Sequence, residues 1–300
     1  MHVGEVFMTR PRSLITRDLA GIMPAAVKAL LEKLEPMALM EEDGLKKGML
    51  ALSILSEKVH NEANTPAAIA DAEGVMILLQ TALLHPEPAL REGATAIVAA
   101  CVTSNDTKFL EASLAKNLPI ALGRLCAEQD RKVKPTDAVK SGEPPQAVDP
   151  DLPTRRVAVR LLEHILLAAE PSFAAQVLAE RTIASTPFKL LVNSDADIRR
   201  HAATMLRALL DNGTSERRVD IAPLLAFVSD EPDKVAEPCI QALSDEDAEI
   251  SGTAVRALLA FRESTPLRDI LMENKAVVME ALDGVKERVG EAASVMEWLQ

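Results

Sequence analysis

One helical pattern recurs along the sequence, and this repeat constrains the fold more than any other feature. In the clearest copy, the segment His85-Pro86-Glu87-Pro88 interrupts the chain, and an apolar stripe follows at Leu90, Ala94, Ile97, Val98, Cys101 and Val102. Proline ends a preceding helix but is well placed at the start of the next one. The spacing of the apolar residues places them on one face of an α-helix. A second copy has the same spacing at Ile198, Ala202, Met205, Leu206, Leu209 and Leu210.

The copies recur at a nearly constant distance along the chain. Their aligned starts fall at Leu45, Leu90, Thr154, Ile198 and Ile250, a period of roughly 45 residues once an insertion before Thr154 is set aside. Helical repeats of roughly 40–47 residues are typical of armadillo and HEAT proteins. No segment shows the alternating pattern of a β-strand. We therefore expect an all-α fold, a right-handed armadillo/HEAT-like α-solenoid of about four or five repeats.

The same pattern suggests how the chain is divided. We expect an N-terminal segment with capping helices at 1–43, repeats 1 and 2 at 44–128, and repeats 3 to 5 with C-terminal capping helices at 154–300. Residues 129–153 interrupt the repeats with Pro135, Pro144, Pro145, Pro150 and Pro153 among charged residues. This composition predicts an exposed insertion. A linker between two domains is the alternative, although the repeat resumes in phase after it.

The composition limits the core and the classes of partner. Only 2% of the residues are aromatic, so the core must be built from aliphatic side chains, as in helix-on-helix packing. The formal net charge is −12, and most of the excess acidic residues lie between Asp211 and Gln300. Such a surface repels phosphate backbones, which argues against a nucleic-acid partner. No apolar run approaches the roughly 20 residues of a transmembrane helix.

No arrangement of residues points to catalysis, a metal or a cofactor. The five histidines are scattered without a second ligand at helical spacing: His2, His60, His85, His164 and His201. There is no glycine-rich phosphate loop and no hydrolase or metalloprotease motif. The three cysteines are far apart in sequence, and we expect buried, reduced thiols rather than a disulfide or zinc site: Cys101, Cys126 and Cys239. We therefore expect a protein that is not an enzyme.

A recurrent arginine is the most informative polar feature. Arg91, Arg155 and Arg199 occupy one repeat position, which is filled by Lys46 and Ser251 in the other copies, and Glu92 and Arg200 lie beside it. One interpretation is a structural ladder, in which each arginine meets a carboxylate or carbonyl of a neighbouring repeat. The other is a row of charge facing a partner, because solenoids bind along extended surfaces. On that reading, the partner-binding residues are Arg91, Glu92, Arg155, Arg199 and Arg200.

The stretch from Leu45 to Leu125 resembles armadillo-type nucleotide-exchange factors of DnaK-type heat-shock chaperones. The resemblance is carried by Ala51-Leu52 to Asn61, Gly74, His85 to Ala94, Ser104-Asn105 and Leu114 to Leu125. It implies a core of armadillo-like repeats that grips the chaperone's ATPase lobe and loosens its nucleotide. The insertion at 129–153, the scarcity of aromatic residues and the acidic C-terminal third depart from that family.

Together these features predict a non-enzymatic solenoid for protein–protein interaction, possibly a nucleotide-exchange factor or co-chaperone. Its partner would then be a chaperone ATPase domain. The alternative is a structural or accessory subunit of a large organellar or cytoskeletal assembly, whose partners are the other subunits. We expect a cytoplasmic location, or an organellar one if the N-terminal segment with Arg10, Arg12 and Arg17 is a targeting sequence.

Overall fold

The computed structural model describes residues 42–61, 65–71, 73–127, 151–168, 171–211 and 219–300. These residues form sixteen helices and no strand, so the predicted all-α fold is confirmed. The helices are α4 (Glu42–Asn61), α5 (Thr65–Asp71), α6 (Glu73–Leu83), α7 (Pro88–Thr103), α8 (Thr107–Ala115), α9 (Leu118–Ala127), α10 (Leu152–Ala168), α11 (Pro171–Leu178), α12 (Arg181–Leu190), α13 (Ala196–Leu210), α14 (Ala222–Asp230), α15 (Asp233–Leu243), α16 (Ala248–Ala260), α17 (Thr265–Glu273), α18 (Lys275–Val285) and α19 (Ala292–Trp298). Apart from the start of α4, the predicted capping helices of residues 1–43 lie outside the described residues.

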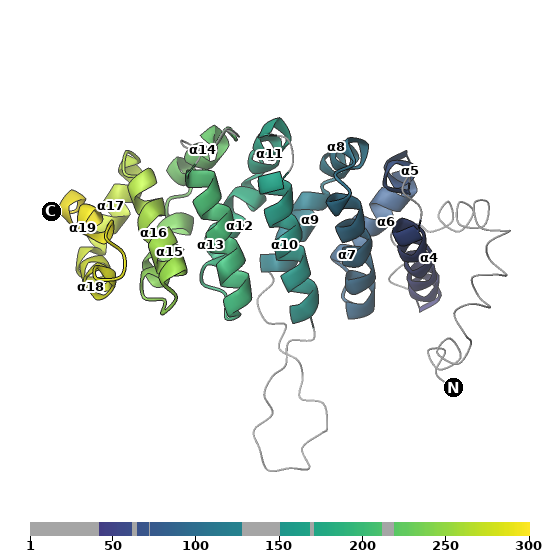
Figure 1. The fold of residues 1–300 in the computed structure, drawn as a ribbon, viewed down its shortest axis with the longest axis horizontal. Coiled ribbons are helices and arrows are strands. Elements are labelled where there is room, and N and C mark those ends of the chain that lie inside the picture. The colour runs from purple at the N-terminus through teal and green to yellow at the C-terminus, as the bar shows by residue number, and fades with distance from the viewer. Residues whose placement is uncertain (1–41, 62–64, 72, 128–150, 169–170, 212–218) are drawn as a thin grey trace, which may run out of the picture.

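The helices fall into three parallel rows along an elongated molecule (Figure 1). The first helices of the units are α5, α8, α11, α14 and α17. The second helices are α6, α9, α12, α15 and α18, and each packs on the following second helix. The third helices are α4, α7, α10, α13, α16 and α19, which also lie side by side in sequence order. Because each unit contacts mainly its neighbours, the described residues form one continuous helical solenoid.

A recurring turn connects the second helix of a unit to its third helix. His85, Asn193 and Asp245 each accept a hydrogen bond from the backbone N–H two residues later, at 2.9–3.0 Å. Such a side-chain turn satisfies a backbone donor where the chain reverses. Two of these turns are followed by a helix-capping aspartate: Asp195 accepts from Ile198 N, and Asp247 accepts from Glu249 N. The same local chemistry therefore starts successive third helices at equivalent places.

The apolar stripes face a single continuous core. Leu90, Ala94, Ile97, Val98 and Cys101 in α7 are at most 1% exposed. Their counterparts in α13 are equally buried, and the cluster of buried hydrophobic residues extends from Ala51 to Leu299. Aromatic side chains are few, but Phe188 lies against Phe227 and Phe261 with ring centroids 6.4 and 6.1 Å apart. Burial thus confirms the predicted register from Leu90 onward.

The register predicted for α4 is wrong by one residue. A repeat that starts at Leu45 would place Met49 on the buried face, but Met49 is 43% exposed, and Gly48 and Ala51 are buried beside Leu52. The repeat in α4 therefore starts at Gly44, and Lys46 aligns with the exposed Glu92 instead of Arg91. In this register Leu52 faces Gly93 of α7, where an added Cβ would be in ordinary van der Waals contact with it at 3.5 Å.

Two further features of the helices differ from what the sequence indicates. The exposed insertion was expected to continue to Pro153, but α10 begins at Leu152 and Asp151 is buried, because its carboxylate pairs with Arg91. Proline is typical of a helix start, but Pro187 lies inside α12. Proline removes one helical hydrogen bond. Burial of Ile183, Ala184 and Phe188 on one face of α12 compensates for that loss.

Candidate interaction surface

The exposed sides of α4, α7, α10, α13 and α16 form one continuous surface, which we call the third-helix face. It is the surface that the sequence predictions concern, because the recurrent arginines lie at the start of three third helices, α7, α10 and α13.

Arg91 is a buried structural residue. Its side chain is 2% exposed, and its guanidinium forms an ion pair with Asp151, including a 3.1 Å hydrogen bond from Nε to Oδ1. It also donates to the backbone carbonyl of His85, the first residue of its own turn. Asp151 immediately precedes α10, so Arg91 links one unit to the next. This contact is the one expected from the structural-ladder interpretation.

Arg155 and Arg199 occupy the same position in the following units. Arg155 is 3% exposed and donates to the carbonyl of Cys126 in α9 at 3.4 Å. Arg199 donates to the carbonyl of Asn193 at 2.9 Å, as Arg91 does to His85, and its Nε lies 2.8 Å from Asp245 of the next unit. The buried Arg91 and Arg155 therefore present no side-chain surface to a partner. For Glu92, Arg199 and Arg200, a role in partner binding stays a prediction.

A second ladder runs along the third-helix face one residue further on. Arg156 holds Asp195 through two hydrogen bonds of 3.2 and 2.6 Å, and Arg200 holds Asp247 at 2.8 Å. Each aspartate caps the next third helix, so each arginine spans two units. The hydrogen bond from the arginine is the main reason that the pKa of each aspartate is lowered. Sequence analysis pointed to Arg200 but missed Arg156, which stands in the same position relative to Arg155.

A histidine adds a link between α10 and α13. Arg160 Nε donates to Nε2 of His201 at 3.1 Å, and Nδ1 of His201 lies 2.5 Å from Glu163. The arginine can only donate, so Nε2 is the acceptor and Nδ1 carries the proton. Further along, Arg207 pairs with Glu249 at 2.9 Å and thereby joins α13 to α16. From α10 to α16, the charged side chains of the face thus bind one another across units.

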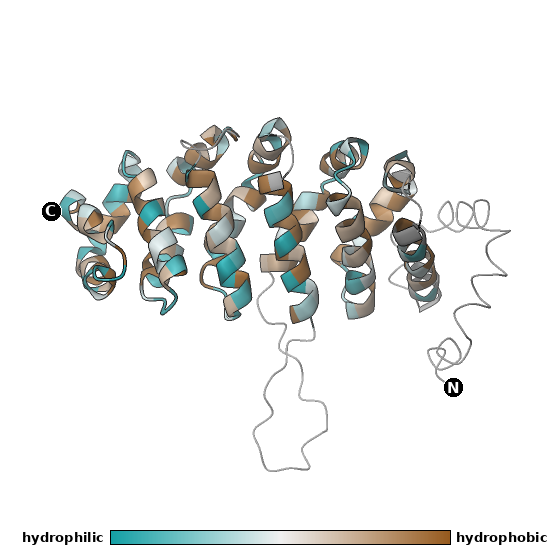
Figure 2. Cartoon of the chain, viewed as in Figure 1, coloured by the Kyte–Doolittle hydropathy of each residue, from teal (hydrophilic) through white to brown (hydrophobic). Residues whose placement is uncertain are grey.

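The N-terminal half of the third-helix face has a different character. The outward positions of α7 hold only small side chains after Glu92: Gly93, Ala96, Ala99, Ala100 and Thr103. Beside α7, Met49 and Leu50 of α4 are 43% and 38% exposed, and Val157 of α10 is 36% exposed. In Figure 2, α7 is mostly pale or brown, whereas α10 and α13 carry hydrophilic bands. The face therefore changes from an apolar patch, formed by α7 with Met49, Leu50 and Val157, to ion-paired side chains on α10, α13 and α16. Outside that patch, α4 also exposes Lys46, Ser53 and Glu57.

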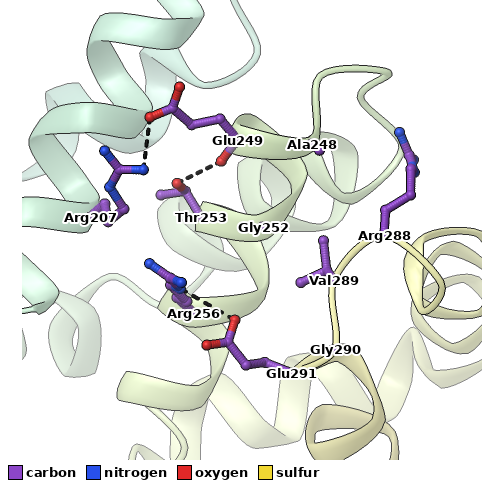
Figure 3. A pocket seen from close by; sticks show the side chains of 10 residues that line it. All are labelled: Arg207, Ala248, Glu249, Gly252, Thr253, Arg256, Arg288, Val289, Gly290 and Glu291. Atoms are coloured by element: carbon purple, nitrogen blue, oxygen red, sulfur yellow. Dashed lines mark hydrogen bonds and ion pairs between the residues drawn. The ribbon is translucent and has the colours of Figure 1, made fainter.

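A groove opens at the C-terminal end of the same face (Figure 3). Its volume is about 260 Å³, and Gly252 of α16 lies between Arg207 on one side and Val289, Gly290 and Glu291 on the other. Arg256, one turn after Gly252, pairs with Glu291 at 3.3 Å and with Asp211 at 3.6 Å.

The remaining chemistry of the described residues is structural. All three cysteines are buried, and burial raises the pKa of each thiol to about 12: Cys101, Cys126 and Cys239. Among the described residues, no group of three or more histidine, cysteine, aspartate or glutamate side chains is placed to hold a metal ion. In the same part of the chain, no single helix is both long and apolar enough to cross a membrane. Only α5 and α6 reach that length and composition, as a pair bent by 97°.

Comparison with known proteins identifies the fold. No protein-family model and no curated protein sequence matches the chain. Among solved structures, it is similar to a computationally designed armadillo repeat protein for modular peptide recognition, with 16% identity over 91% of this chain and all of the other, at a TM-score of 0.52. An engineered protein solved by a structural genomics consortium is 19% identical over 91% of this chain and 96% of its own, at a TM-score of 0.50.

These likenesses, together with the sixteen described helices, confirm the predicted class. The chain has an armadillo-like repeat fold. At such low identity the likeness extends to the fold alone, because one fold supports many functions.

Proposed function

We propose that this protein is a non-catalytic binding solenoid that holds a partner protein along its third-helix face, in the cytoplasm. The observation that carries the proposal is the apolar half of that face. Met49 and Leu50 of α4 and Val157 of α10 are exposed on either side of α7, whose own exposed residues are mostly alanines. The larger apolar side chains therefore flank a strip of small ones. Contiguous exposed apolar surface marks interaction sites, because leaving it in water is unfavourable.

The ion-paired half of the face supports the same proposal in another way. Arg156, Arg200 and Arg207 each connect one third helix to the next, so the units are held at fixed spacing. A surface that is already ordered loses less conformational entropy when it binds. The third-helix face would therefore act as a preorganised track for an extended or helical segment of the partner.

The experiment is affinity purification of the tagged protein from its native cells, with Ala96→Arg and Ala115→Arg variants compared by mass spectrometry. Ala96 is exposed at the centre of the apolar half, and Ala115 is exposed at the end of α8, a first helix. Both variants place the same charge at an exposed alanine, so only the site differs. We expect Ala96→Arg to lose the partner and Ala115→Arg to keep it. Equal recovery with both variants would refute the proposed surface.

The more specific candidate within this proposal is a nucleotide-exchange factor or co-chaperone. Its support is the sequence resemblance over Leu45 to Leu125, which contains most of the apolar half of the face. The direct assay is release of a fluorescent ADP analogue from a DnaK-type chaperone. An exchange factor accelerates that release, and Ala96→Arg should abolish the effect. Without acceleration by the unmodified protein, the exchange-factor candidate is excluded and the broader binding proposal still stands.

A further inference from the structure

One link between α10 and α13 differs in chemistry from the other links of the third-helix face. The capping aspartates Asp195 and Asp247 each accept from an arginine of the preceding unit, which lowers the pKa of each carboxyl group, so both stay ionised well below neutral pH. Arg160 instead donates to Nε2 of His201, a ring nitrogen, at 3.1 Å. Histidine ordinarily changes its charge between pH 5 and 8. The link from Arg160 is therefore the one of these three that a small change of pH can alter.

The two sides of the His201 ring are held differently. Nδ1 lies 2.5 Å from Oε2 of Glu163, and both side chains are largely covered, at 27% and 22% exposure. Nδ1 already carries a proton, so a second proton must enter at Nε2. Nε2 then has no lone pair with which to accept from Arg160, and two cations face each other at hydrogen-bond distance. Protonation thus strengthens the contact with Glu163 and breaks the contact with Arg160.

Arg160 has nothing else to hold it in place. Within the described part of the chain, the hydrogen bond to His201 is the single hydrogen bond or ion pair of this side chain. The residue is exposed, so its guanidinium can move into solvent when the bond is lost.

The charged groups that face His201 come from α10 and from α13 itself. Arg160 and Glu163 contact the ring, and Arg156 lies one turn before Arg160. On α13, Asp197 lies one turn before His201 and pairs with Arg156 at 3.5 Å. The contacts of the ring with Arg160 and Glu163 therefore decide how it responds to a proton.

The other two helices that pack on α13 use their charged residues elsewhere. α16 lies on the opposite side of α13 from α10 (Figure 1), and its Glu249 and Arg256 pair with Arg207 and Glu291. The two cations of α12 both lie near Glu231: Arg181 and Lys189. None of these pairs involves His201.

A second histidine of α10 provides a natural contrast. Nε2 of His164 lies 3.1 Å from Oδ1 of Asn105. A carbonyl oxygen only accepts, so Nε2 of His164 is the donor, and a proton added at Nδ1 leaves this hydrogen bond in place. His201 accepts through Nε2 and loses its bond on protonation, whereas His164 donates through Nε2 and keeps it.

The position of Arg160 connects this link to the apolar patch. Arg160 stands six residues after Thr154, the first buried residue of α10, as Ala96 stands six residues after Leu90 in α7. Both residues are exposed on neighbouring third helices (Figure 1). On the α13 side the protonated ring repels the guanidinium, and on the other side lies α7 with its small side chains. A released Arg160 therefore adds a positive charge beside the apolar patch.

We propose that His201 is a pH-sensitive link in the third-helix face, whose protonation at Nε2 releases Arg160 from α13 and places its charge beside the apolar patch. The release follows from the contacts of α10 and α13 alone and goes beyond the proposed function. Its consequence for binding rests on the proposed function: an apolar segment of the partner binds more weakly at pH 6 than at pH 8, because the charge must lose water when that segment covers it.

The direct test follows Nε–H of Arg160 and the ring nitrogens of His201 by NMR, in the ¹⁵N-labelled full chain between pH 8 and pH 5.5. We expect the proton on Nδ1 of His201 at pH 8, and an Nε–H signal of Arg160 that shifts with the same midpoint as the ring. Nε–H of Arg156, which is bonded to Asp195, is the internal control and should not follow that midpoint. A proton on Nε2 of His201 at pH 8, or an Arg160 signal that ignores the titration of the ring, would overturn the inference.

Two matched variants assign the effect to one histidine. His201→Gln retains a side-chain oxygen that can accept but cannot titrate, so the Arg160 signal should lose its pH midpoint. His164→Gln removes the other histidine of this region and should leave the midpoint of the Arg160 signal in place. A midpoint that persists in His201→Gln, or disappears in His164→Gln, would refute the assignment to His201.

The consequence for binding is tested with the partner that Ala115→Arg retains and Ala96→Arg loses. We expect the unmodified protein and His164→Gln to recover less of this partner at pH 6 than at pH 8, and His201→Gln to recover equal amounts. Equal recovery by the unmodified protein at both pH values would contradict this consequence. If Ala96→Arg loses no partner, the proposed function is wrong, whereas the NMR experiment on Arg160 needs no partner and decides the link by itself.

Discussion

The buried pair of Arg91 and Asp151 allows the strongest quantitative prediction. The two side chains are 2% and 9% exposed, and they join α7 to the residue that precedes α10. Replacing Asp151 by alanine leaves the guanidinium of Arg91 charged and surrounded by protein. The guanidinium would then keep its hydrogen bond to the neutral backbone carbonyl of His85, which does not balance its charge.

The expected cost follows from the burial. Breaking a buried ion pair by removing one partner destabilises a protein by about 3–5 kcal/mol, because an uncompensated charge remains in the interior. We expect a loss of that size in the free energy of unfolding of Asp151→Ala, measured by urea denaturation with circular dichroism. Replacing both members by apolar residues, as in Arg91→Met with Asp151→Leu, should recover most of it.

Asp230→Ala is the matched control. Asp230 pairs with Arg181 at 2.6 Å, but the side chains are 54% and 67% exposed. A solvent-exposed pair contributes about 0–1 kcal/mol, so this variant should unfold almost like the unmodified protein. If Asp151→Ala costs no more than Asp230→Ala, the charge of Arg91 is not held in the interior, and the reasoning about the ladder fails.

Three further predictions test the packing of the repeats. Because burial raises the pKa of the three cysteine thiols from 9.0 to about 12, they should not react with a thiol reagent at pH 8 in the folded state. The stability that they contribute should be complete below pH 9 and be lost as the pH rises towards 12, as a pH series of melting temperatures would show. Ala202→Asp buries a charge in α13 and should cost about 3 kcal/mol or more, whereas Ala208→Asp on the exposed side of that helix should cost little. Deleting residues 129–149 should leave the melting temperature nearly unchanged, but a deletion to 153, which also removes Asp151, should lower it clearly.

The sequence was sufficient to predict the fold because the same apolar helical pattern is repeated along it. An apolar stripe such as that of α7 specifies a helix and its buried face, and successive copies fix the period without reference to distant contacts. The errors in helix register and helix boundary arose where the position of a helix depended on its contacts with a neighbouring unit. The register of α4 depends on its packing against α7, and the start of α10 depends on Arg91, which is far away in sequence.

The candidate surface was less predictable for the same reason. The arginine pattern identified Arg91, Arg155 and Arg199, but the exposure of each side chain depends on how neighbouring units pack against it. Arg91 is inside, whereas Arg156 and Arg200, one residue after the predicted position, lie on the face. The sequence did contain a usable pattern. The third helix that follows Arg156 and the one that follows Arg200 each begin after an aspartate, Asp195 and Asp247, which can cap the helix and accept from the arginine.

The measurement that tests the central claim most directly is site-specific photo-crosslinking in native cells. A photoreactive amino acid replaces Ala96 on the third-helix face or Ala115 on the row of first helices, and both positions are exposed. The account predicts one dominant crosslinked partner from Ala96 and none of that species from Ala115. The same partner crosslinked from Ala115 and absent from Ala96 would show that binding uses another face, and would contradict the account.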